Sequence, residues 1–237
     1  MTGPFPYVGV SGLLYLVLFT IVVPVLAIRS ARRMRDAPLP DRLAVFRSVL
    51  IQQLAILGVA WYVARTEWVP IYVAPDALLK ALGLAGLATA TLVLAFRPMW
   101  RRAVERGEAR IQLLMPSTRV ERILWLLVSL AAGIAEEVAY RGVLWVLLER
   151  LLGSSVAAAV IASLVFGVSH VLQGWRSAVV ISFVALGMHG LVRATGSLLA
   201  PILVHVAYDM IAGLSYAALH RAHRQRVTTD PAWPIVR

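Results

Sequence analysis

The chain has 237 residues, of which 60% are hydrophobic and only 15% are charged, and its formal net charge is +11. An ordinary soluble domain is about 45–50% apolar and about 25% charged, so this composition excludes that class. The chain has no cysteine, which excludes disulfides, thiolate metal sites and cysteine nucleophiles. The apolar residues come in runs of about 20, long enough to cross a bilayer. We therefore expect an all-α, polytopic membrane protein.

The apolar runs predict about seven spans in a transmembrane helical bundle. In chain order they lie at 8–28, 43–64, 77–96, 123–148, 155–172, 177–192 and 197–219. The second run is weakened by Arg47, Gln52 and Gln53. A transmembrane β-barrel would show alternating apolarity over about ten residues, which these runs do not. The first run lacks a basic segment before it, so we expect a retained span and not a cleaved signal peptide.

The arginines predict the orientation. If the N-terminus lies outside, segments 29–42, 97–122 and 220–237 are cytoplasmic, and the outer segments keep only Arg65, Arg150 and Arg193. The positive-inside rule favours this arrangement, with a cytoplasmic C-terminus. We interpret the positive charge as topology, because nucleic-acid binding would need a soluble basic domain with base-reading elements.

Three regions are expected: residues 1–119 with three spans and a basic loop, 120–219 with four spans, and a basic tail at 220–237. The loop at 97–122 is open to two interpretations, an amphipathic helix on anionic lipid or a solvated loop. A cap at Ser117 or Thr118, with Glu121 three residues beyond Thr118, predicts the start of the fourth helix.

Three carboxylates lie deep inside predicted spans: Glu136, Glu137 and Asp209. An ionised residue at the bilayer centre costs about 2.5–3.5 kcal/mol on insertion scales, so such residues pair, face a cavity or do chemistry. Glu137 and Arg141 are four residues apart and share a helix face, which predicts an ion pair. Glu136 has no basic partner on its own helix, so it needs one on another helix or stays protonated. A purely structural ion pair with one protonated glutamate is the alternative.

Two histidines supply candidate partners. His170 lies in the fifth predicted span, and His205 lies in the seventh with Asp209 four residues later on the same face. At 1.5 Å per residue, Glu136, His170 and His205 lie roughly 20, 22 and 12 Å from the ends of their spans. All three can therefore meet in the middle third of a core about 30 Å thick. His189 is expected to pack or to line a pore.

Water activation is the chemistry that this set supports. A divalent metal, of which zinc is the first candidate, could be bound by His170, His205, Asp209 and Glu136. Such a metal lowers the pKa of a bound water to about 7. Alternatively, Glu136 and a histidine polarise water without a metal. The zincin string H-E-x-x-H is absent.

We expect Gly187, Gly190 and Gly196 to permit close helix approach, and Pro201 to open the seventh helix.

The segment "EEVAYRG" resembles the E-E-x-x-x-R-G motif of the CPBP family of CAAX proteases and bacteriocin-processing enzymes, also called Abi proteins. "FGVSH" resembles its F-x-x-x-H motif, and "TGSLLAPILVHVAYD" resembles its third motif, which ends in H-x-x-x-N or H-x-x-x-D. The three motifs occur in the family's order, and the resemblance covers roughly residues 120–217.

The resemblance implies an intramembrane endopeptidase of the type II CAAX kind. By motif position Glu136 is the general base, His170 positions water or binds metal, His205 is the second ligand, and Glu137 with Arg141 supports the site. Asp209 stands where the eukaryotic enzymes carry Asn. The best-known eukaryotic member removes the last three residues of prenylated CAAX proteins, whereas many bacterial members act on no prenylated protein.

The expected partners are membrane lipid and a protein or peptide substrate, either prenylated or membrane-associated, and no nucleic acid. The expected location is the plasma membrane, as an integral protein of a bacterial inner membrane. Two other function classes stay open: a non-catalytic binding or bacteriocin-immunity protein on the same scaffold, and a small proton-coupled transporter, because buried Glu, His and Asp also form proton relays. Haem binding by His170 and His205 is a more distant alternative.

Overall fold

The structure is a computed structural model that describes residues 7–34, 38, 40–107 and 116–229, and every regular element in these residues is helical. Its elements are α1 (Val10–Val17), η1 (Leu18–Val22), α2 (Val23–Arg33), α3 (Arg42–Thr66), α4 (Leu78–Glu105), α6 (Arg119–Glu136), η2 (Glu137–Leu144), α7 (Trp145–Leu152), α8 (Ser155–Ser169), η3 (Val171–Gln173), α9 (Trp175–Thr195) and α10 (Leu199–Thr229). The predicted all-α fold is confirmed.

Six helical stretches of the described chain are long and apolar enough to cross a membrane. The fifth predicted span is different, because α8 has only 15 residues, or about 22 Å at 1.5 Å per residue. It ends at His170, and Gly174 then takes a φ of +102° that redirects the chain into α9. The integral membrane character is thus supported by six long helices, while the number of spans and the orientation stay predictions.

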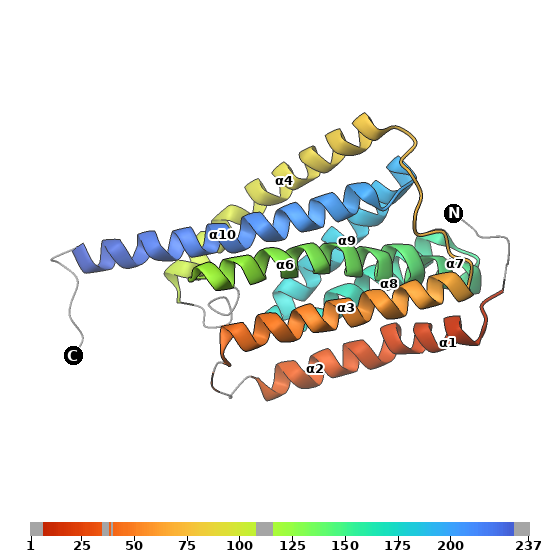
Figure 1. Cartoon of the computed structure of the whole chain (residues 1–237), viewed down its shortest axis with the longest axis horizontal. Coiled ribbons are helices and arrows are strands. Elements are labelled where there is room, and N and C mark those ends of the chain that lie inside the picture. The colour runs from red at the N-terminus through yellow and green to blue at the C-terminus, as the bar shows by residue number, and fades with distance from the viewer. Residues whose placement is uncertain (1–6, 35–37, 39, 108–115, 230–237) are drawn as a thin grey trace.

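The helices lie lengthwise beside one another (Figure 1). The ends of α2, α4 and α10 lie at the same end of the bundle as the beginnings of α3 and α6. The arginine-rich segments 29–42 and 97–122 adjoin these helix ends. The charge asymmetry of the sequence therefore corresponds to one end of the molecule.

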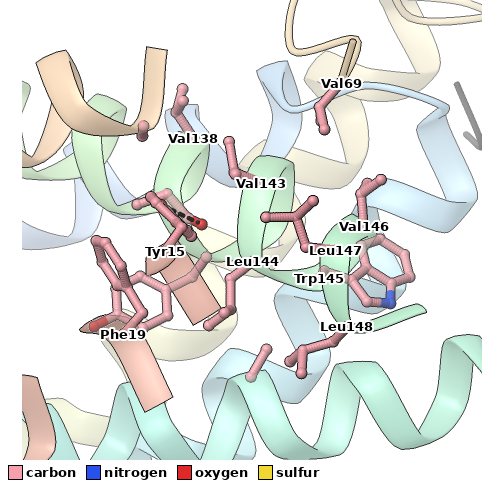
Figure 2. Packing of buried hydrophobic residues seen from close by; sticks show 14 of the residues in the cluster. Tyr15, Phe19, Val69, Val138, Val143, Leu144, Trp145, Val146, Leu147 and Leu148 are labelled. Carbon is pink, nitrogen blue, oxygen red and sulfur yellow. Dashed lines mark hydrogen bonds between the residues drawn. The ribbon is translucent and has the colours of Figure 1, made fainter. Parts of the chain in front are cut away.

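The stretch formed by α6, η2 and α7 is the central one. In its most apolar window 56% of residues are buried, against 11–33% in the other five long helices. The main hydrophobic core surrounds η2 and α7. In Figure 2, Tyr15 and Phe19 lie on one side of Leu144, and Trp145 and Leu148 lie on its other side. The segment that holds the charged motif is thus enclosed by the rest of the bundle.

Close helix packing occurs at glycines other than those expected within α9. A Cβ added to Gly187 or Gly190 would meet no other atom within 4 Å, so the prediction that they allow close approach is wrong. A Cβ on Gly133 would instead lie 2.4 Å from a methyl group of Val206, which brings α6 and α10 together. A Cβ on Gly167 would lie 2.4 Å from the carbonyl of Ala178, which does the same for α8 and α9.

Two helix ends also differ from expectation. Pro201 lies in the first turn of α10, where a missing N–H breaks no hydrogen bond, so the prediction that it opens the helix is wrong. α10 continues to Thr229, into the predicted tail, and α4 continues past Pro98 to Glu105. Residues 108–115 of the predicted basic loop lie outside the described residues. The predicted cap at Thr118 is confirmed, with Glu121 completing a capping box.

A buried carboxylate joins the N-terminal helix to the rest of the bundle. Glu67, one residue after α3, accepts hydrogen bonds from the backbone N–H groups of Gly9 (2.9 Å) and Gly12 (2.7 Å) and from the Ser11 hydroxyl (2.5 Å). Arg150 donates to the Glu67 carbonyl oxygen at 2.8 Å. The carboxylate thus satisfies free donors at the start of α1, where a negative charge is also favoured by the helix dipole.

Glu67 should make stability depend on pH. Burial opposes its ionisation, but the hydrogen bonds from Ser11, Gly9 and Gly12 and the charge of Arg150 together hold its pKa below the ordinary value. The stabilisation is then fully present above the unfolded-state pKa of about 4.3 and is lost as the pH falls through the lower folded-state value. We expect the difference in Tm between wild type and Glu67→Gln, measured in detergent, to be largest at neutral pH and to shrink below about pH 4.

Glu105→Gln is the matched control, because Glu105 is an exposed carboxylate that pairs with Arg101. This variant should stay close to wild type at every pH. A Glu67→Gln effect of equal size at pH 3 and pH 7 would contradict the assigned role of the ionised carboxylate.

Candidate active site

The segment EEVAYRG begins where the central helix changes its hydrogen-bonding pattern. α6 ends at Glu136, and the next eight residues form the π-helix η2, in which bonds span five residues instead of four. The Tyr15 hydroxyl donates to the carbonyl oxygen of Ala139 within this segment, at 3.1 Å. All residues of η2 are buried. π-helical turns inside α-helices occur frequently at functional sites, which makes this segment the first place to look for one.

Glu136 has two carboxylate oxygens in different surroundings, and the residue is 8% exposed. The Gln53 side-chain amide donates to Oε1 at 2.6 Å. Oε2 has no hydrogen-bond partner among the described residues. It faces His170 Nε2 at 3.6 Å and His205 Nε2 at 3.8 Å. One oxygen is therefore fixed by an amide from α3, and the other points at two imidazoles.

The hydrogen bonds of the two histidines fix which ring nitrogen faces Glu136. His170 Nδ1 lies 2.8 Å from the Phe166 carbonyl oxygen, and His205 Nδ1 lies 2.8 Å from Glu137 Oε1. A carbonyl and a carboxylate only accept, so we assign a hydrogen to each Nδ1. In a neutral ring the lone pair is then on Nε2. Both imidazoles thus present the same kind of nitrogen to Glu136 Oε2.

Glu137 is the structural member of the glutamate pair. Its side chain is fully buried, and its Oε1 accepts from Arg141 at 3.0 Å as well as from His205. The four-residue spacing therefore gives the ion pair that the sequence predicts. The Arg141 guanidinium also lies over the Phe166 ring, with Cζ 4.3 Å from the ring centroid. Glu137 and Arg141 thus neutralise each other's charge, and Glu137 also orients His205.

Phe166 packs at the centre of these groups. Its ring centroid lies 4.5 Å from that of His170 and 6.3 Å from that of His205. It also makes an edge contact with Tyr140 at 4.9 Å. Because the face of an aromatic ring is electron-rich, it stabilises the buried cation of Arg141. Phe166 therefore packs against both Arg141 and His170 and lies close to His205.

Asp209 lies one helical turn beyond His205 on α10. Its Oδ2 is 3.6 Å from His205 Nε2, and its side chain is 31% exposed, more than any other member of the cluster. The Trp125 indole N–H donates to the Asp209 backbone carbonyl at 3.0 Å. A Cβ on Gly213 would lie 2.2 Å from the same indole nitrogen, so that glycine makes room for Trp125. α6 therefore holds this part of α10 in place.

A cavity of about 1220 Å³ adjoins the cluster. Its polar lining includes the glutamines of α3, Gln52 and Gln53, and the cluster of Glu136, Glu137, Arg141, His170, His205 and Asp209. The rest of the lining is largely apolar and comes from α2, α3, α4 and α9, for example Leu26, Val49, Phe96 and Val184. The cluster thus lies on the wall of a cavity that is large enough for a ligand and has a mostly apolar lining.

The structure brings together all the residues singled out in the sequence. Glu136, His170, His205 and Asp209 lie on three different helical elements and meet at one wall of the cavity, though their catalytic roles stay predictions. His170 stands at the end of α8 and not inside it. His189 is buried and stacks edge-on against Trp145 at 4.7 Å, as expected of a packing residue.

Sequence reasoning missed two contributors to the cluster. Gln53 stands out in the sequence only as a polar residue that weakens the second span, although a buried amide in an apolar run is itself a signal. Phe166 is the first residue of FGVSH, four positions before His170, and so always shares its helix face. The partner that Glu136 required from another helix is therefore a neutral amide on α3.

The donor atoms suit a divalent metal chemically, because imidazole nitrogens and carboxylate oxygens are zinc ligands. Each imidazole also donates its other N–H to a fixed acceptor, as metal-binding histidines do. Within residues 7–34, 38, 40–107 and 116–229, however, no group of three or more His, Cys, Asp or Glu is arranged to hold a metal ion. The side chains as they lie do not form a metal site.

The fold and the cluster define a class: an integral membrane protein with carboxylates and imidazoles buried in its helical bundle. Residues 118–211 match the model of a protein family described as "Rce1-like: Type II CAAX prenyl endopeptidase Rce1-like". This match confirms the resemblance of the segment to the CAAX proteases of the CPBP group. No curated protein and no solved structure matches the chain.

The family match indicates an intramembrane endopeptidase, a hydrolase that acts on proteins or peptides in the membrane. The matched segment begins at the cap of α6 and ends two residues beyond Asp209 in α10. It contains the glutamates, both histidines and Asp209. Helices α1 to α4 lie outside it.

The buried ion pair gives a test of stability. Replacing Arg141 by Met leaves the Glu137 carboxylate without its cation, and breaking a buried pair in this way costs about 3–5 kcal/mol. We expect Arg141→Met to lower the thermal unfolding midpoint in detergent by several degrees, and a second change, Glu137→Gln, to recover part of the loss. Arg193→Met, at an exposed arginine near the end of α9, is the matched control. An Arg141→Met variant as stable as this control would show that the pair is not needed.

Proposed function

We propose that this chain is an intramembrane endopeptidase in which Glu136 activates the water that attacks a peptide bond. The observation that supports this most directly is the approach of His170 Nε2 and His205 Nε2 to the free oxygen of Glu136, at 3.6 and 3.8 Å, on the wall of a cavity. These separations are too long for direct hydrogen bonds, and a water placed beside the three atoms would lie within reach of all of them.

In the proposed reaction Glu136 Oε2 takes one proton from the water as its oxygen attacks the peptide carbonyl carbon. The carbonyl oxygen becomes the negatively charged oxygen of a tetrahedral intermediate. The carbon–nitrogen bond then breaks, and Glu136 returns the proton to the leaving amine. A positioned base of this kind contributes about 10²- to 10⁴-fold to a rate.

The two histidines and Asp209 orient and stabilise. His170 would hold the water through Nε2. A protonated His205 would donate from Nε2 to the developing oxyanion, the kind of charge stabilisation that often dominates acyl-transfer catalysis. Glu137 holds the imidazole of His205 by its Nδ1. Asp209, 3.6 Å from His205 Nε2, is better placed to orient and charge-balance that ring than to contact the oxyanion itself.

A protein or peptide that carries a lipid or an apolar segment is the substrate that the cavity supports. Its lining away from the polar cluster is largely apolar, and apolar surface favours an apolar occupant. The family name supplies a concrete probe, a farnesylated peptide that ends in a C-terminal CAAX sequence. The same peptide without the farnesyl group distinguishes a need for the lipid from a need for the peptide alone.

Binding of a divalent metal, with zinc as the first candidate, is a separate proposal. His170, His205, Asp209 and Glu136 are the residues that would hold it, and it would lower the pKa of a bound water. Because no group of three among the described residues is arranged for such an ion, the chemistry proposed above uses side chains alone.

Removal of the base is the primary test. We expect Glu136→Ala to lower cleavage of the probe peptide at least about 100-fold, because a general base contributes about 10²- to 10⁴-fold. The variant should still fold and insert, since it removes a buried carboxylate and leaves the buried Glu137–Arg141 ion pair intact. Glu149→Ala, at a carboxylate near the end of the same long helix, should cleave like wild type.

Other results would favour other functions. Full cleavage by Glu136→Ala would reject Glu136 as the base. Absence of cleavage by wild type, with a biological function that survives both Glu136→Ala and His205→Ala, would favour a binding or immunity protein. Proton flux into liposomes that depends on Glu136 would favour a transporter.

Metal content can be measured directly. If the cluster works through side chains alone, purified wild type and His205→Ala should contain equal, substoichiometric zinc, and a chelator should leave the cleavage rate unchanged. Zinc near one equivalent in wild type that is lost in His205→Ala, together with inhibition by chelator, would instead establish a metal site formed by rearrangement of these residues.

A further inference from the structure

Gln53 is an unusual residue for its position in α3. Most of this helix is exposed, and only 17% of its most apolar window is buried. Gln52 and Gln53 both line the cavity, but Gln52 and Leu54 are exposed, whereas Gln53 is only 5% exposed. α3 lies beside α6 in Figure 1. A polar side chain that turns into a membrane protein's interior marks a functional position by default.

The contact of Gln53 with Glu136 divides the roles of the two carboxylate oxygens. Its amide nitrogen donates to Oε1 at 2.6 Å, and the described residues offer Oε2 no hydrogen-bond partner. A carboxylate that rotated freely could present either oxygen to the imidazoles. The amide removes this freedom, so Oε2 is the oxygen that faces His170 and His205.

The group that holds Glu136 Oε1 is neutral. Arg141, a cation on the same long helix, pairs with Glu137 Oε1 at 3.0 Å. The amide of Gln53 therefore positions the Glu136 carboxylate without adding a charge to the apolar interior.

Stability alone does not explain Gln53. Its own carbonyl oxygen, Oε1, is buried and has no partner among the described residues. A buried acceptor without a hydrogen bond costs free energy that an apolar side chain of the same shape would not. A polar residue kept under this cost points to a role in the site.

We propose that Gln53 is a positioning residue that holds Glu136 Oε1 and thereby commits Oε2 to the water. The inference rests on the proposed function and extends it beyond the family match, which begins at residue 118. It makes α3 part of the catalytic unit. Tyr15 of α1 supports the same conclusion, because its hydroxyl donates to Ala139 inside η2.

The test compares Gln53→Met, which keeps the shape but removes the donor, with Gln52→Met, the same change at the neighbouring glutamine, which also lines the cavity but does not hold Glu136. For the farnesylated CAAX peptide, Gln53→Met should lower kcat about 10- to 100-fold with little change in KM, the usual cost of losing a residue that orients a catalytic one. Gln52→Met should keep the wild-type kcat.

A second variant covers the possibility that Gln53→Met does not fold. Gln53→Asn keeps an amide at this position but is one methylene group shorter, so its donor should no longer reach Oε1 and kcat should fall as in Gln53→Met. Infrared spectroscopy at one fixed pH reads Glu136 without activity, through the carboxylate stretching bands that disappear in Glu136→Gln. These bands should shift in Gln53→Met, because a hydrogen bond to one oxygen makes the two carbon–oxygen bonds unequal, and should keep their wild-type positions in Gln52→Met.

The outcomes separate this inference from the proposed function. If Glu136→Ala abolishes cleavage while Gln53→Met keeps both the wild-type kcat and the wild-type infrared bands, the inference is wrong and the proposed function stands. If Glu136→Ala still cleaves, the assigned base is wrong, and the infrared bands alone then decide whether Gln53 holds the Glu136 carboxylate. Infrared bands unchanged by Gln53→Met would overturn the inference in either case.

Discussion

One carboxylate oxygen, Oε1 of Glu137, links the central helix of this protein to α10. It accepts from Arg141 on its own helix and from His205 on α10, in a place that is fully buried. A charge in such surroundings is tolerated only if it is paired and hydrogen-bonded. Both donors are therefore fixed, and the orientation of His205 follows from the need to neutralise Glu137. The close packing of Gly133 against Val206 brings α10 near enough to α6 for this bond to form.

Two adjacent glutamates thus have opposite roles. Neighbouring residues on a helix point about 100° apart, so one can face the interior while the other faces a cavity. Glu137 uses its charge for structure. Glu136 keeps one oxygen free beside two imidazoles, and the hydrogen bond that it accepts on the other comes from the uncharged amide of Gln53. Glu137 makes the burial of charge tolerable, and Glu136 is left available for chemistry.

Periodicity and charge spacing predicted the parts of this structure that depend on local sequence. The long apolar runs gave the helices, the four-residue spacing gave the Glu137–Arg141 pair, and Thr118 with Glu121 gave the start of α6. Contacts between helices were not predictable in this way. The close approach at Gly133, instead of Gly187, depends on which faces meet. Likewise, nothing in the spacing of Gln53 indicates that it reaches a residue 83 positions later.

The π-helix has a consequence for how this sequence can change. Each wide turn of η2 accommodates one residue more than an α-helical turn would. A change of length is therefore absorbed differently here than in an α-helix, where deleting one residue rotates everything beyond it by about 100°. In η2 a single deletion can be taken up by a return to α-helical turns, so α7 would rotate by less. Glu137 and Arg141, then three residues apart, would still share a helix face. Loss of one residue from this segment should disturb the packing of α7 less than the same deletion within α6 or α7.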